Sequence, residues 1–459
     1  MSGRTLIRRV ALGACRDTGG RVRADGDPHD VLVADGRIAR VSPSGDDRAG
    51  GADTGDRDDA HAIDGTGLIA LPGFTDLYGR LREPGPAGRG TLARETRAAL
   101  AGGFVRVACA PDTHPVIEDV ATLELIRRRA AVRPGAEVLP IAALTRGLDG
   151  RELAPLATLQ ADGCVAAGQA DRPLEDTGVL LSAMQYAASF ELPLFMTPRD
   201  ARLGAEGCAH DGAIASRLGL PGIPVAAETV ALARLLELVR ESVVRGRGCR
   251  LHVSRLSSAR GVALVAEAKE AGLSVTADVG IHHLLFSEAE LDGFDARYRS
   301  AVPFRSAGDR AALRDGVRSG VIDAICSDHA PHDGDARLAP FPACAPGLAA
   351  YDRFLPMLLA LPALLDMPVA DVLRRVTAAP ARVLGLATAG HDGRLAEGAT
   401  ASLILVDPDA AEAPPWLGAG RNTPLENARD LSELTDERAP LRGAVRVAFV
   451  GGERRFDTR

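Results

Sequence analysis

Hydrophobic and polar positions along residues 68–386 alternate between short apolar runs and longer stretches with a period near that of a helix. Short β-branched runs of this kind predict buried strands, and the longer stretches predict helices that cover them. We count eight candidate strands, near residues 68–71, 104–110, 138–145, 163–167, 192–196, 249–254, 273–279 and 321–327. Eight strands that alternate with helices predict an α/β fold, a (β/α)8 TIM barrel around a parallel sheet.

The two ends of the chain have a different pattern. Residues 6–12, 31–35 and 38–41 predict short strands with a turn at Asp35-Gly36, and residues 402–406 and 445–453 predict two more. These strands lie outside the alternating region. We therefore expect β structure at both ends of the chain in addition to the barrel.

Composition adds a size and an expected compartment to this picture. A chain of 459 residues with 46% hydrophobic content can bury one large core and a smaller one. No apolar run reaches the length of a membrane span, and the first residues lack a signal-peptide pattern. The net charge of -7 is spread without a basic stripe, which argues against nucleic acid as a partner. The seven cysteines lack Cys-x-x-Cys spacing, so we expect buried free thiols in a cytoplasmic protein without membrane partners.

Several motifs follow one another along the chain. Residues 71–85 read Leu-Pro-Gly-Phe-Thr-Asp-Leu-Tyr-Gly-Arg-Leu-Arg-Glu-Pro-Gly. Further motifs lie at residues 102–104, 110–115, 219–224, 282–285, 327–332 (Ser-Asp-His-Ala-Pro-His) and 421–424 (Arg-Asn-Thr-Pro). Together they resemble the class I dihydroorotases of the amidohydrolase superfamily, whose first motif reads Pro-Gly-x-x-Asp-x-His-x-His-Leu-Arg-Glu-Pro-Gly. The resemblance spans nearly the whole chain.

The resemblance implies a domain organisation. In amidohydrolases the two chain ends meet in a small β-sandwich beside the barrel. We therefore expect residues 1–67 and 387–459 to form a composite β-sandwich domain, and residues 68–386 to form the amidohydrolase-like TIM barrel.

The resemblance also implies a zinc centre in active relatives, and most of its ligands are missing from this sequence. Only one family ligand is unchanged, the aspartate after the eighth strand, Asp328. An acid that bridges two metals in the family aligns with Gln169 or Ala170, and Asp171 stands one position late. The degenerate metal-ligand positions are therefore Tyr78, Arg80, Gln169, Thr197 and Arg255.

These replacements argue against a metal cofactor. A lone carboxylate does not hold a divalent ion against water, and two guanidinium groups would repel a cation. The single lysine, Lys269, lies on an amphipathic stretch that we expect to face solvent, so it is a poor metal-bridging carbamate. Without a metal there is no activated hydroxide, and we expect no catalytic residues beyond a vestigial Asp328. Because Asp328 would be a costly buried charge, we expect Arg80 or Arg255 to pair with it.

Some of the substrate pocket remains recognisable through the resemblance. Arg82 matches the family arginine that grips the substrate carboxylate, and His332 matches a substrate-contacting histidine. Asp112 replaces a family asparagine and would repel an anion. Structural roles are the simpler interpretation of the other motif side chains, with the 421–424 segment fixing a loop of the small domain and with His282, His283 and His329 forming structural hydrogen bonds.

Two functions remain open. Dihydroorotase-like proteins with the same ligand losses are associated with aspartate transcarbamoylase, which implies a non-catalytic subunit that supports assembly of that enzyme in de novo pyrimidine biosynthesis. Such a subunit would contact the aspartate transcarbamoylase catalytic chain and form a homo-oligomer within the larger complex. The alternative is a catalytically active amidohydrolase that hydrolyses a cyclic amide with an altered metal set, or without metal through Asp328 with His332 or Tyr78.

Overall fold

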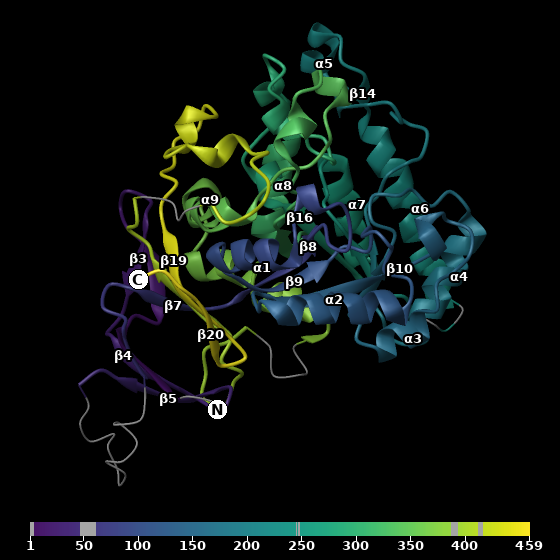
Figure 1. Ribbon diagram of the computed structural model, residues 1–459. Coiled ribbons are helices and arrows are strands. Elements are labelled where there is room, and N and C mark those ends of the chain that lie inside the picture. Colours follow the sequence, from purple (N-terminus) through teal and green to yellow (C-terminus); the bar gives the residue numbers. More distant parts are fainter. Residues whose placement is uncertain (1–3, 46–60, 245, 247, 387–392, 412–415) are drawn as a thin grey trace.

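The computed structural model describes residues 4–45, 61–244, 246, 248–386, 393–411 and 416–459. Figure 1 shows a central barrel wrapped by helices, with strands from the two ends of the chain lying together on one side of it. No helix in these ranges is long and apolar enough to cross a membrane. All seven cysteines are free thiols, and all except the half-buried Cys15 are buried, as predicted.

The barrel is an eight-stranded parallel sheet within the described residues. Its strands are, in order around the sheet, β8 (Phe74–Gly79), β9 (Phe104–Cys109), β10 (Glu137–Ala143), β11 (Ala166–Gly168), β12 (Leu194–Met196), β15 (Leu251–Val253), β16 (Val275–Gly280) and β17 (Ala324–Cys326). A parallel bridge between Gly79 and His329 joins the first strand to the segment after the last one and nearly closes the sheet. The predicted TIM barrel is confirmed.

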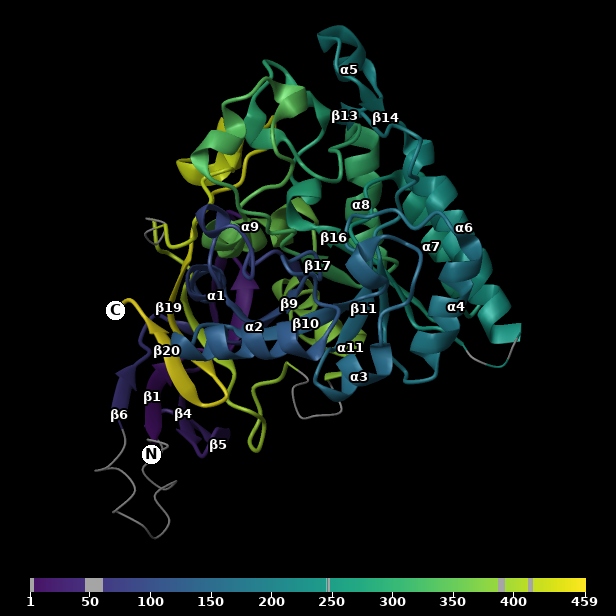
Figure 2. The same ribbon diagram turned by 45° about the vertical axis from the view of Figure 1, so that its right-hand side comes forward.

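Helices form the outer layer because each buries one apolar face against the sheet. They are α1 (Leu92–Ala101), α2 (Val120–Val132), α3 (Leu156–Ala161), α4 (Thr177–Ala188), α6 (Val225–Val244), α7 (Ala259–Glu270), α8 (Ala307–Ser319), α9 (Tyr351–Leu364), α10 (Val369–Arg374) and α11 (Ala378–Val383). Side chains that accept a backbone N–H start several of them, for example Asp119 at α2 and Ser258 at α7. A smaller excursion, with β13 (Ala209–His210), α5 (Ala213–Leu218) and β14 (Gly222–Ile223), projects from the barrel in Figure 2.

Short 3-10 helices shape the loops that leave the strands and the C-terminal segment. They are η3 (Ala87–Arg89), η4 (Arg146–Leu148), η5 (Ile281–Leu284), η6 (Glu288–Leu291), η7 (Ala296–Tyr298), η8 (Gly334–Arg337), η9 (Phe341–Ala343), η11 (Pro424–Glu426) and η12 (Leu431–Glu433). Most of them lie near the C-terminal ends of the barrel strands, where the candidate site is.

The ends of the chain form two four-stranded sheets. One contains β5 (Arg37–Pro43), β4 (His29–Ala34), β1 (Thr5–Val10) and β6 (His61–Asp64), and the other contains β20 (Glu453–Asp457), β19 (Ala444–Val450), β18 (Leu403–Asp407) and β7 (Ile69–Pro72). Ile7, Ile38, Leu403 and Phe449 belong to one hydrophobic cluster that both sheets share. A separate hairpin of β2 (Gly13–Arg16) and β3 (Val22–Asp25) packs beside them.

The turn predicted at Asp35-Gly36 is present, and both residues have positive φ, as a tight hairpin turn requires. One strand prediction runs too far and another is wrong. The strand predicted at 445–453 is present as β19 but ends at Val450, because Gly451 and Gly452 turn the chain into β20. The stretch near 68–71 is a strand, but it pairs antiparallel with β18 in the end sheet, so the first barrel strand is β8. The predicted boundary at residue 387 lies outside the described residues.

Candidate functional site

The candidate site lies at the C-terminal ends of the barrel strands. Tyr78 is in the last part of β8 and Arg80 follows it, while Thr197 and Arg255 follow β12 and β15. Asp328 follows β17. Because parallel strands end at the same face of a barrel, these side chains converge there.

Arg255 is the centre of this cluster. Its guanidinium donates from Nη1 to Asp328 Oδ1 at 2.9 Å and from Nη2 to Thr197 Oγ1 at 2.6 Å, and Nη2 also pairs with Asp171. The guanidinium carbon lies 4.0 Å from the centroid of the Tyr78 ring, an attractive cation–π contact. Arg255 is 1% exposed. The expected pairing of Arg255 with Asp328 is therefore present.

Arg80 does not pair with Asp328. Its Nε donates to Asp112 Oδ2 at 2.8 Å, and its Nη2 pairs with Asp171 and donates to Tyr78 Oη at 3.0 Å. The chain thus places one arginine on each side of the Asp171 carboxylate. Asp112 is the acid that we expected to repel a ligand, and its charge is instead taken up by Arg80.

Asp171 is the residue whose role the sequence did not reveal. Its two carboxylate oxygens bridge the two guanidinium groups, where the family would have a carboxylate that bridges two metal ions. Gln169 is turned away and forms hydrogen bonds with Thr145 Oγ1. Ala170 has a φ of 52°, an unusual conformation for a residue with a side chain, and it is the link that brings the next residue into the centre.

The charges in this cluster are fixed by their neighbours. Burial raises the pKa of Asp171, but the charges of Arg255 and Arg80 outweigh it and hold the pKa far below its usual range. Burial raises the pKa of Tyr78 well above that of an ordinary phenol. Burial lowers the pKa of both arginines, but the neighbouring carboxylates outweigh it. Asp112 and Asp171 raise the pKa of Arg80, and Asp171 and Asp328 raise that of Arg255, so both arginines stay charged. Two arginines and three aspartates therefore form one ion-paired network with a formal net charge of -1.

Little open space remains beside this network. The cavity bordered by Asp171, Thr197, Arg255 and Ala301 has a volume of about 30 Å³. That is room for one or two water molecules, whereas ligand pockets usually measure about 300 to 1,000 Å³. The side chains themselves fill the place in which a substrate and metals would sit.

Arg82 and His332, the other two predicted pocket residues, are close together but already bonded. Arg82 Nε donates to the Pro331 carbonyl at 3.1 Å, and its Nη2 lies 3.2 Å from His332 Nε2. His332 Nε2 also lies 2.9 Å from the carbonyl of Pro346. Burial lowers the pKa of Arg82 to about 10 and that of His332 to about 4, so His332 is neutral at pH 7.

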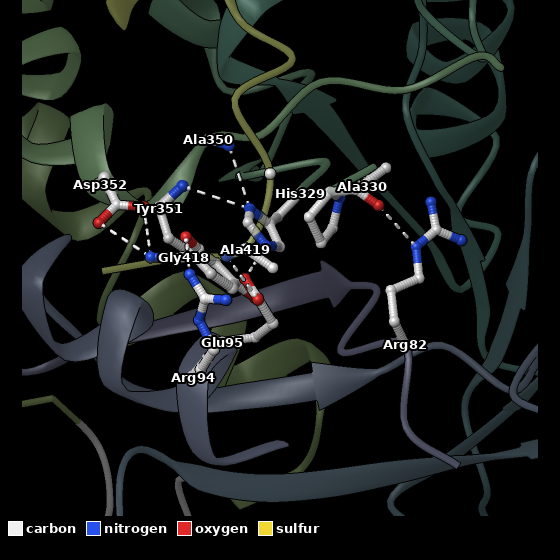
Figure 3. Close-up of polar contacts among 12 residues, drawn as sticks. Arg82, Arg94, Glu95, His329, Ala330, Ala350, Tyr351, Asp352, Gly418 and Ala419 are labelled. Atoms are coloured by element: carbon white, nitrogen blue, oxygen red, sulfur yellow. Dashed lines mark hydrogen bonds and ion pairs between the residues drawn. The ribbon is translucent and has the colours of Figure 1, made fainter. Parts of the chain in front are cut away.

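His329 belongs to a separate structural network, shown in Figure 3. Its Nδ1 accepts the backbone N–H of Ala350 at 3.0 Å, so the proton of the neutral ring lies on Nε2, which donates to Glu95 at 3.0 Å. Glu95 also accepts the N–H of Ala419, while Asp352 accepts those of the two preceding residues. Two buried carboxylates thus hold the C-terminal segment against the barrel.

The 421–424 motif acts at the barrel mouth and not within the small domain, which corrects our prediction. Asn422 Nδ2 donates to the carbonyls of Ala330 and Gly347, and its Oδ1 accepts the N–H of His332. Of the two histidines after β16, His283 forms the expected structural hydrogen bond, from its Nε2 to the Val302 carbonyl at 3.1 Å. His282 does not: within the described residues its buried Nε2 has no partner, and its ring stacks on Phe286. Lys269 is also not free in solvent, because its Nζ pairs with Asp323 at 2.7 Å.

Comparison with known proteins agrees with this geometry. A family model described as "Dihydro-orotase-like" matches residues 67–260, and one described as "Amidohydrolase family" matches residues 222–445. A "Dihydroorotase-like protein" of Pseudomonas putida is 42% identical over 86% of this chain and 88% of its own length. The chain belongs to the dihydroorotase-like amidohydrolases.

This dihydroorotase-like chain is also similar to one further sequence relative and to one solved structure. A "Dihydroorotase" of Anaeromyxobacter sp. (strain K) is 37% identical over 87% of the chain and 89% of its own length. The L-hydantoinase (dihydropyrimidinase) of Arthrobacter aurescens superposes with a TM-score of 0.77 at 20% identity, over 99% of this chain and 96% of that one. The second likeness concerns the fold alone.

The zinc centre implied by the dihydroorotase-like family does not fit the residues present. Within the ranges that the structure describes, no group of three or more histidine, cysteine, aspartate or glutamate side chains is arranged to hold a metal ion. The two arginines would place positive charge where a cation has to bind. The one family ligand that remains, Asp328, and the neighbouring acid Asp171 each already pair with Arg255 through a carboxylate oxygen.

Acid titration should reveal the charge network of this dihydroorotase-like chain. Because the folded pKa of Asp171 lies below its unfolded value near 3.8, its charged form stabilises the fold above that value. That contribution is lost as the pH falls below about 4 and through the folded pKa. We expect the midpoint of urea unfolding to fall more steeply between about pH 4 and pH 2 in the wild type than in Asp171→Asn. An exposed control, Asp335→Asn, should keep the wild-type slope, and equal slopes in all three proteins would contradict the assignment.

Proposed function

We propose that this chain is a non-catalytic, metal-free dihydroorotase-like subunit that supports assembly of aspartate transcarbamoylase in de novo pyrimidine biosynthesis, in the cytoplasm. The observation that carries the proposal is the network of Arg80 and Arg255 with Asp171, Asp112 and Asp328 at the positions of the family metal centre. The resemblance to ligand-deficient dihydroorotase-like proteins supplies the partner.

The chemistry of the site supports the non-catalytic part. Hydrolysis of a cyclic amide by this family needs a metal-activated hydroxide at the centre of the barrel. Here that position holds two guanidinium groups, and the adjoining cavity has about 30 Å³ of space. Arg82, the residue expected to bind a substrate carboxylate, donates its Nε–H to the backbone carbonyl of Pro331 instead. A chain with the complete family fold still presents the outer surface that a partner subunit could bind, even though ion pairs fill its centre.

Co-expression with the aspartate transcarbamoylase catalytic chain of the same organism tests the proposal. We expect the two chains to elute together in size-exclusion chromatography, at a mass by light scattering that requires several copies of each. The transcarbamoylase expressed alone is the control, and we expect it to be smaller or less stable. Separate elution of the two chains, with this chain as a small oligomer, would contradict the assembly role.

The alternative function is an active amidohydrolase with an altered metal set or no metal. The similarity to a relative named dihydroorotase, at 37% identity, supports this alternative. Metal-free acid–base catalysis by Asp328 with Tyr78 or His332 has little support, because all three side chains are engaged within the protein. Elemental analysis of the purified chain, together with a dihydroorotate hydrolysis assay, separates the two functions. Stoichiometric metal and turnover would favour the enzyme.

A further inference from the structure

A second cavity opens at the opposite end of the barrel from the candidate site. It has a volume of about 180 Å³ and lies beneath the N-terminal ends of β12, β15, β16 and β17, with α11 as its floor. Its polar lining includes Arg250, His252, Thr276, Asp323 and Arg382. It is larger than the cavity beside the ion-paired network, and the proposed function makes no use of it.

The walls of this cavity carry uncompensated positive charge. The Arg250 guanidinium donates to the backbone carbonyls of Glu191, Arg382 and Val383, which carry no net charge. Arg382 is exposed and, within the described residues, forms no side-chain hydrogen bond or ion pair. The one acid, Asp323, is neutralised by Lys269 at 2.7 Å. Two arginines therefore line a small space whose one acidic residue is already paired with a lysine.

The roof of the cavity connects it to the charge network. His252 is 1% exposed, its Nδ1 lies 2.9 Å from Thr276 Oγ1, and its Nε2 lies 3.1 Å from Asp278 Oδ2. With a neutral ring, Nε2 donates to Asp278 and Nδ1 accepts the Thr276 hydroxyl. The other oxygen of Asp278 accepts the backbone N–H of Arg255. A chain of hydrogen bonds thus runs from the cavity to the arginine at the centre of the network.

We propose that this cavity binds a small organic anion that carries a carboxylate or phosphate group, held by Arg250 and Arg382. Planar guanidinium groups match the geometry of both anions and bind them through charge-assisted hydrogen bonds. The size is suitable for a small metabolite, since a cavity of about 150 Å³ in another protein holds benzene. Occupancy is sensed by His252 through Thr276 and reaches Arg255 through Asp278.

Calorimetric titration of the full chain with inorganic phosphate and with succinate tests the site, with sodium chloride at matched ionic strength as the control. We expect saturable binding of at least one probe and none of chloride. Arg382→Ala, at an exposed position, should weaken binding at least tenfold without affecting folding, because it removes a charge-assisted contact. Arg151→Ala, an exposed arginine away from the cavity, should bind as the wild type does.

Two further readouts separate this site from a water-filled gap and from anion binding elsewhere. Ala379→Leu places a larger side chain into the cavity from α11 and should abolish the saturable heat. The ring signals of His252, assigned by their loss in His252→Gln, should shift with the bound probe in wild-type protein and stay fixed in Arg382→Ala. Heats that equal those of chloride, or binding that survives both Arg382→Ala and Ala379→Leu, would overturn the proposal. Neither outcome depends on an association with aspartate transcarbamoylase.

Discussion

Replacement of Arg255 by methionine is expected to lower the free energy of unfolding by about 3 to 5 kcal/mol, the usual cost when one partner of a buried ion pair is removed. The substitution leaves Asp328, with 8% of its side chain exposed, without a cation, and leaves Asp171 with Arg80 alone. Methionine keeps much of the volume and loses the charge. Urea unfolding at pH 7, followed by far-UV circular dichroism, measures the change.

Two variants show whether charge or packing causes the loss. Arg128→Ala removes an exposed arginine whose partner is Glu124, and it should change the stability by no more than about 0.5 kcal/mol. The triple variant Arg255→Met, Asp171→Asn, Asp328→Asn removes the stranded charges as well and should regain much of the lost stability. A loss of less than about 1 kcal/mol in Arg255→Met would mean that the network is not the buried, ion-paired structure that its geometry implies.

The barrel could be predicted from the sequence because its strands and helices have different periods, which repeat along the chain. The failure at residues 68–71 has a physical cause. Both that stretch and β8 are short buried runs, and periodicity does not tell which sheet a strand joins. The partner of β7 is β18, more than three hundred residues away, and no local signal identifies it. Pairing across such a separation is a property of the folded chain.

The candidate site was predictable to the extent that charge dictates partners. A buried aspartate near new arginines implies an ion pair, and Arg255 meets Asp328 as that argument requires. The argument did not distinguish Arg255 from Arg80, since both follow strands that end at the same face. The role of Asp171 depends on the positive φ of Ala170, which only the folded backbone reveals.

The backbone at and beside the family's metal-ligand positions is unusual. Arg82, Ala170, Arg255 and Asp328 all have positive φ values, between 47° and 62°, which cost energy in residues with side chains. Such conformations persist where the surrounding structure determines them, and in enzymes they often position functional groups. These conformations define the backbone frame that holds the side chains at and beside the family's metal-ligand positions.

The last prediction follows from that frame. The variant Tyr78→His, Arg80→His, Thr197→His, Arg255→His restores the imidazoles implied by the family motifs and keeps Asp171 and Asp328 as carboxylates. Without metal it should be less stable than the wild type, because both acids lose their guanidinium partners. With zinc it should regain stability, by about 2.7 kcal/mol when free zinc is one hundred times the dissociation constant.

Zinc-dependent unfolding, elemental analysis after dialysis and reversal by a chelator measure this gain. The matched control carries glutamine at the same four positions, which keeps similar size and polarity but provides no imidazole ligands. We expect stoichiometric zinc in the histidine variant and none in the control. A histidine variant that stays metal-free while folded would mean that the frame itself has moved and that ligand loss alone does not explain the closed centre. Stoichiometric zinc would show that four side chains separate the ion-paired centre from a metal-binding one.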